Sequence, residues 1–178
     1  TTFEYLMGQC SFGKAHADSI YNMFRVERYI SNPAAEEDQP IITMSTQVSG
    51  AGYGHNSYGK ASLSYLALKD LLGDQVFKKA LHHYMDTWNG KHPIPWDYFG
   101  SINAGAGQNL NWFFQNWFFT NNYIDLKVGK VDHNNGAYQM HIENVGGFAI
   151  PFDVRVFFTD GSTNTLHQTP GSWKQNEK

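Results

Sequence analysis

The chain has 178 residues, 41% hydrophobic and 16% aromatic, which is enough apolar material for a packed core and excludes a disordered protein. Its formal net charge is −3, and Lys and Arg gather on no stretch, so nucleic acid and anionic membranes are not expected partners. No run approaches the roughly 20 apolar residues of a membrane span. The single cysteine, Cys10, excludes an internal disulfide and a Cys-based zinc cluster, and we expect it to be a buried small hydrophobe.

The first 120 residues or so are expected to be helical. Helices are predicted over 1–10 and about 15–30, with an interruption at Gly13. Residues 31–56 hold several prolines and glycines and are expected to form a long irregular loop, with the acidic cluster Glu36-Glu37-Asp38 solvated. Loops of that length inside a compact domain are usually functional or mobile.

Two long helices with a short connection follow, over about 57–72 and 74–88. The second carries one apolar stripe at helical spacing. Gly73 can end the first helix in a left-handed conformation, and the Asp74 carboxylate can cap the second. The pattern therefore predicts a helical hairpin.

Two shorter helices complete this part of the chain. One is expected from about Asp97, after a stop at Pro93-Ile94-Pro95, to the glycine-rich turn at 105–107. The other covers 110–119 with Asn109 as its N-cap. Its aromatic residues recur at helical spacing, which favours core packing over a sugar-stacking platform.

After Asn121-Asn122 the apolar period changes to a near-alternating one. About four antiparallel strands are expected, with turns at Asn134-Asn135-Gly136, Gly146-Gly147 and Asp160-Gly161. The predicted fold class is α+β: a mostly helical part followed by a small or incomplete antiparallel β-sandwich. The predicted domains are 1–122 and 123–178.

Motifs that hold metals or phosphates are absent from the sequence. None of the eight histidines forms an HxxxH pair, and the adjacent His82 and His83 would point about 100° apart on a helix. His141-Ile142-Glu143 lacks the PCxxC partner of a zinc deaminase. No GxSxG elbow, phosphate loop or dinucleotide fingerprint is present. A self-contained zinc site is therefore not expected.

The segment from Tyr53 to Ala61 is the remaining candidate for chemistry. Its two tyrosines, Tyr53 and Tyr58, lie five apart where the expected loop meets a long helix. A phenol there can point into a cleft and donate a hydrogen bond to developing negative charge. Tyrosines at helix starts are also common, so composition alone leaves both interpretations open.

Five short motifs in order resemble the aminopeptidase N family of zinc aminopeptidases (gluzincins). They are Thr1-Thr2-Phe3-Glu4-Tyr5-Leu6, Tyr58-Gly59-Lys60-Ala61, Leu71-Leu72-Gly73-Asp74 with Phe77-Lys78-Lys79-Ala80-Leu81-His82-His83-Tyr84, Trp112-Phe113-Phe114-Gln115-Asn116-Trp117-Phe118, and the tail signals Asn144-Val145-Gly146-Gly147, Pro151, Asp160-Gly161 and Trp173. Together they span nearly the whole chain. Gly59 and Ala61 depart from the glutamate and glycine that the family has at those two positions.

The resemblance implies that residues 1–122 are the helical part of a thermolysin-like peptidase domain. It implies zinc held in the parent protein by HExxH and a later glutamate just before Thr1, so this chain alone would bind no zinc and be inactive. Tyr58 would be catalytic, donating its hydroxyl to the oxyanion; Tyr53 would bind substrate; Lys60 would be structural. No metal ligand is assigned to this chain.

The partners implied are a peptide substrate and the rest of the catalytic domain. A non-catalytic peptide- or glycan-binding module, descended from a peptidase and using the 31–56 loop, is the alternative. A single cysteine does not fix the compartment, and a periplasmic or secreted parent is the expectation.

Overall fold

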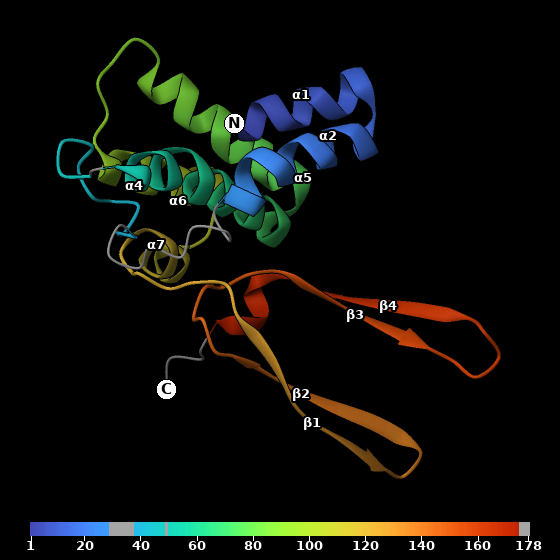
Figure 1. The fold of residues 1–178 in the computed structure, drawn as a ribbon. Coiled ribbons are helices and arrows are strands. Elements are labelled where there is room, and N and C mark those ends of the chain that lie inside the picture. Colours follow the sequence, from blue (N-terminus) through green and yellow to red (C-terminus); the bar gives the residue numbers. More distant parts are fainter. Residues whose placement is uncertain (29–37, 49, 175–178) are drawn as a thin grey trace.

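The computed structural model describes residues 1–28, 38–48 and 50–174 and shows a helical part from which two β-hairpins project (Figure 1). The helical elements are α1 Thr2–Phe12, α2 Lys14–Tyr21, the π-helix η1 Asn22–Val26, α4 Ala51–Gly54, the π-helix η2 His55–Lys60, α5 Ala61–Trp88, α6 Pro95–Ala106 and α7 Asn111–Phe118. The strands are β1 Leu126–Asn134, β2 Ala137–Asn144, β3 Phe152–Phe157 and β4 Thr163–Gln168, followed by the 3-10 helix η3 Pro170–Trp173. The α+β prediction is confirmed.

The helix ends follow local signals. Gly13 breaks α1 from α2 with φ of 83°, and Gly73 has φ of 71° inside α5, where it separates the two predicted helices by a sharp kink. Pro95 begins α6, and the Asp97 carboxylate accepts a hydrogen bond from the Ile94 N–H at 2.9 Å. Asp74 pairs with Lys69.

Helix α7 begins slightly later than predicted. The helix begins at Asn111, with Leu110 in the N-cap position and without a side-chain cap, while the Asn109 side chain accepts from the Asn111 N–H two residues on at 2.9 Å. The aromatic residues of α7 are core residues, as predicted.

The core lies between α5, α6 and α7 and extends to the connection between the hairpins. Its most deeply buried apolar members are Leu68, Ala80, Ile102, Leu110, Phe113, Phe114, Trp117 and Phe148. Gly105 lets α6 approach α5, since a Cβ there would lie 2.7 Å from the Ala80 Cα. The Trp117 indole stacks on the Phe148 ring at 4.4 Å and donates to the Ala149 carbonyl at 3.0 Å. This aromatic stack joins the helices to the β part.

The β part consists of two separate antiparallel pairs, β1 with β2 and β3 with β4. The β1–β2 turn has positive φ at Asn135 and Gly136, as a tight hairpin turn requires. Several of its apolar side chains stay exposed, Val128, Val131 and Tyr138 among them. Facing residues of the two hairpins line an open groove of about 810 Å³, so the sandwich is incomplete. The division at 122/123 into two domains stays a prediction.

Three local expectations are wrong. The loop predicted over 31–56 is wrong for residues 51–56, because Ala51–Gly54 is already helical and continues into η2, while residues 31–37 and 49 of that loop lie outside the described residues. Asp38 is not a solvated loop residue but pairs with Lys60; the neighbouring Glu36 and Glu37 lie outside the described residues. Cys10 is exposed, not buried.

Candidate active site

Both candidate tyrosines lie on the helical segment that leads into α5. Tyr53 is on α4 and Tyr58 on η2, and their side chains are 45% and 44% exposed. Residues five apart on an α-helix would diverge by about 140°. Because η2 has the wider π-helical turn, the two rings instead meet edge to face with centroids 6.1 Å apart. The structure thus brings the predicted pair together.

Tyr58 lies at the boundary of two cavities. One, of about 300 Å³, is largely apolar and lies between the start of α1 and the start of α5. The other, of about 290 Å³, lies between η1 and η2 and includes two arginines. Among residues 1–28, 38–48 and 50–174, none forms a hydrogen bond with the Tyr58 hydroxyl. Its O–H is therefore available to a ligand.

A buried lysine fixes η2 two residues after Tyr58. The Lys60 side chain is 0% exposed, and its Nζ donates to Asp38 Oδ1 and to the Gln39 carbonyl, each at 2.8 Å. It also lies 5.8 Å from the centroid of the Phe148 ring. Burial lowers the pKa of the Lys60 ammonium, and the Asp38 carboxylate opposes that shift. The ion pair holds segment 38–40 against the tyrosine-bearing helix.

The same segment has two further anchors. Asn56 Nδ2 donates to the Pro40 carbonyl at 3.3 Å, and Asn121 Nδ2 donates to the Asp38 carbonyl at 2.9 Å. These bonds compensate for the absence of regular secondary structure over 38–40. Segment 38–40 is thus fixed both to η2 and to the end of the helical part.

The α1–α2 hairpin is fixed to the other side of the tyrosine segment through Ser62. The Tyr21 hydroxyl lies 2.7 Å from Ser62 Oγ, and Thr2 Oγ1 lies 3.2 Å from the same atom. Within the hairpin the Tyr5 hydroxyl donates to Asp18 Oδ1 at 2.6 Å. Burial, together with this carboxylate, raises the pKa of Tyr5 to about 12, so Tyr5 stays a neutral donor.

A guanidinium group lies over the face of Tyr58. Arg25 on η1 places its Cζ 5.7 Å from the centroid of the Tyr58 ring. The only carboxylate within 4 Å of Arg25 in the described part of the chain is Glu4, at 3.9 Å and largely exposed. A cation in this position raises the positive potential beside the phenol.

A family model, the peptidase family M1 domain, matches residues 1–117. The match covers well over half of the chain and includes both tyrosines, Lys60 and the helices that hold them. The chain belongs to peptidase family M1. No curated protein matched the chain.

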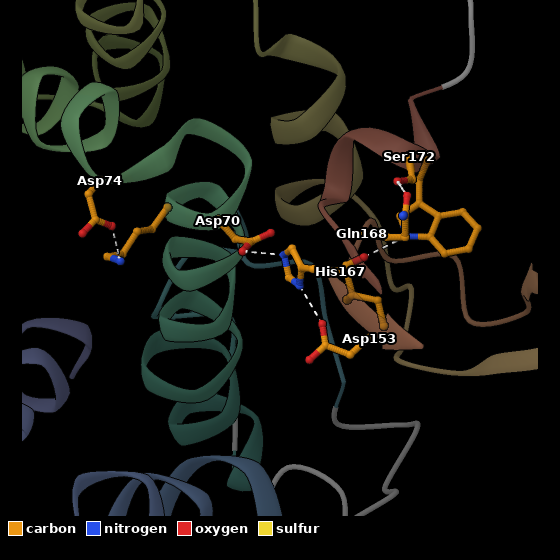
Figure 2. Close-up of polar contacts among 9 residues, drawn as sticks. Asp70, Asp74, Asp153, His167, Gln168 and Ser172 are labelled. Carbon is orange, nitrogen blue, oxygen red and sulfur yellow. Dashed lines mark hydrogen bonds and ion pairs between the residues drawn. The ribbon is translucent and has the colours of Figure 1, made fainter. Parts of the chain in front are cut away.

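Peptidases of family M1 are generally zinc-dependent. In the part of the chain that the structure describes, no group of three His, Cys, Asp or Glu side chains could hold a metal ion. Figure 2 shows a His–carboxylate cluster, in which His167 Nδ1 lies 2.7 Å from Asp153 Oδ1 and Nε2 lies 3.0 Å from Asp70 Oδ1. The carboxylates occupy opposite edges of one imidazole and cannot converge with it on one ion. The described residues do not fit a zinc centre of the M1 kind.

Three features of this candidate site were not found from sequence. Asp38, Arg25 and Phe148 lie far along the chain from Tyr58 and Lys60, so no local pattern connects them. The lysine two residues after a candidate tyrosine was the only available signal, since a lysine buried by its neighbours requires a carboxylate partner.

In the part of the chain that the structure describes, none of the helices has the length and apolar character of a membrane span.

Proposed function

We propose that this chain is the tyrosine-bearing part of a zinc aminopeptidase of the aminopeptidase N kind, which releases N-terminal residues from peptides. The observation that carries the proposal is the exposed Tyr58 phenol, which lines two cavities of an M1 chain and has no hydrogen-bond partner among the described residues.

The chemical role of Tyr58 follows from its position. Nucleophilic attack on the scissile carbonyl turns its oxygen into an oxyanion. The Tyr58 O–H donates a hydrogen bond to that oxygen and so stabilises the tetrahedral intermediate more than the substrate. The anchored η2 helix keeps the phenol in place, so little reorganisation accompanies the step.

Tyr53 has a different role in this proposal. Its ring packs edge-on against Tyr58 and is equally exposed. It contacts the bound peptide and restricts the Tyr58 ring, without donating to the oxyanion. Loss of Tyr53 then weakens substrate binding more than turnover.

The zinc ligands belong to the parent protein upstream of Thr1, as the resemblance implies. This chain alone then binds no zinc and cleaves nothing. A periplasmic or secreted parent is part of the same proposal.

The test is an aminopeptidase and zinc-binding assay on two polypeptides side by side. One is this chain, and the other extends about a hundred residues upstream in the parent. We expect only the extended polypeptide to bind zinc and to release N-terminal residues. If the extended polypeptide does neither and lacks the upstream ligands, the proposal is wrong and a peptide-binding module takes its place.

A further inference from the structure

The cavity between η1 and η2 has a charge that the oxyanion role of Tyr58 does not use. It is lined by Phe24, Arg25, Arg28, Tyr58 and the glycines at 54 and 59, among others. Two of these side chains are guanidinium groups, and none of the described residues that line the cavity is acidic. A cavity of about 290 Å³ with two arginines suits a small anion.

Among the residues that the structure describes, the two arginines have little negative charge near them. Arg25 lies over the Tyr58 ring and has a long contact of 3.9 Å with the exposed Glu4 carboxylate. Arg28 lies over the Phe24 ring, with its Cζ 5.3 Å from the ring centroid. Aromatic faces hold guanidinium groups in place without using their N–H donors. Among residues 1–28, 38–48 and 50–174, Glu4 has the only carboxylate within 4 Å of these donors, so the described part of the chain leaves most of them for a ligand.

The distance from Tyr58 fits the length of a short peptide. Arg25 Cζ is 5.7 Å from the centroid of the Tyr58 ring, whose hydroxyl marks the scissile carbonyl. One or two extended residues beyond that carbonyl span about 3.5–7 Å, a length comparable with the separation between the Tyr58 ring and Arg25, and Arg28 lines the same cavity. The glycines at 54 and 59 carry no side chain that would obstruct the approach.

We propose that Arg25 and Arg28 bind the C-terminal carboxylate of a short peptide substrate whose scissile carbonyl lies at Tyr58. The inference rests on the proposed function and adds a substrate class to it: di- and tripeptides with a free carboxyl end. Such peptides are bound at both the reacting carbonyl and the carboxylate.

The experiment compares a tripeptide with its C-terminal amide in the zinc-loaded parent enzyme. The two substrates differ only in the carboxylate, so the ratio of their kcat/KM values isolates its recognition. We expect the wild-type ratio to favour the acid. Arg28→Gln and Arg25→Gln should each lower this ratio about tenfold or more, the usual effect of removing a hydrogen bond between charged groups. Arg28→Lys keeps the positive charge but loses the paired N–H donors of the guanidinium, so its ratio should lie between those of the wild type and Arg28→Gln.

Arg155→Gln is the matched control, because Arg155 is an exposed arginine on β3. It should leave the ratio at its wild-type value. Since Arg25 also contacts the Tyr58 ring, Arg28→Gln decides the matter if Arg25→Gln does not fold.

Equal acid-to-amide ratios in the wild type, Arg28→Gln and Arg155→Gln would overturn the carboxylate site while leaving the peptidase assignment intact. A wild-type parent that cleaves neither substrate would instead contradict the proposed function itself.

Discussion

The junction between helices and strands and the surface around Tyr58 are built in opposite ways. At the junction, Trp117 and Phe148 are both about 1% exposed and stack in parallel, and Asn116 bonds to the backbone at both 147 and 149. Around Tyr58 the two tyrosine rings are almost half exposed, the helix is a π-helix, and the Tyr58 ring meets the edge of Tyr53 and the guanidinium of Arg25. The comparison indicates that the junction supplies stability, and in our proposal the tyrosine surface supplies the chemistry.

The largest effect on stability is expected at the junction. Trp117→Ala should lower the free energy of unfolding by about 3–5 kcal/mol, because it removes a buried indole and leaves a cavity against Phe148. Trp96→Ala is the matched control, since Trp96 is 60% exposed, and it should cost much less. Denaturant unfolding of both variants measures the difference. Equal losses would remove the contrast between the two regions.

The ion pair of Lys60 connects the two regions, since its Nζ reaches Asp38 and approaches the Phe148 ring. Asp38→Asn should cost about 3 kcal/mol, because it leaves a buried ammonium without its counter-charge. Lys60→Met should cost less, since the Asp38 carboxylate is partly exposed and can be solvated. The same unfolding assay ranks the two variants. If Lys60→Met destabilised the protein more than Asp38→Asn, the unpaired buried ammonium would not be the main cause of the lost stability.

The smallest effect is expected at His167, which connects the β3–β4 hairpin to α5. The hydrogen bond to Asp153, and then the Asp70 carboxylate, raise the pKa of His167 above its ordinary value of 6.5. The folded state therefore binds the proton more tightly than the unfolded state. The resulting stabilisation is present below pH 6.5 and is lost as the pH rises through the raised folded pKa.

Because the side chain of His167 is 48% exposed, this stabilisation should stay below about 1 kcal/mol. Unfolding of the wild type and His167→Gln across pH 5–9 measures it. The two proteins should differ most at the acidic end and converge as the pH rises. A difference that is constant with pH would contradict the protonated bridge.

Sequence reasoning succeeded where the signal was local. Glycine at 13, 73 and 136 needs no tertiary contact to adopt positive φ, and the aromatic spacing of α7 specifies one buried face. Sequence reasoning failed at residues 51–56, where the glycines led to the prediction of an irregular loop and the structure has a helix. There, the bonds from Asn56 to Pro40 and from Lys60 to Asp38 hold the chain in a helical conformation that its intrinsic propensity disfavours.

The candidate site divides in the same way. The Tyr53–Tyr58 pair could be chosen from five-residue spacing and resemblance. The position of Arg25 over Tyr58 depends on how the α1–α2 hairpin attaches through Ser62, which only the folded chain reveals. Distant contacts of this kind carry no local sequence pattern.

The most direct test of the account is the steady-state kinetics of Tyr58→Phe in the zinc-loaded parent enzyme. Removing one oxyanion donor should lower kcat about a hundred- to a thousandfold. KM and the free energy of unfolding should stay close to wild type, because the exposed hydroxyl has no bond to lose among the described residues. Tyr123→Phe, at a similarly exposed tyrosine before β1, is the control and should turn over normally. Near-normal turnover of Tyr58→Phe would contradict the assignment of the oxyanion donor.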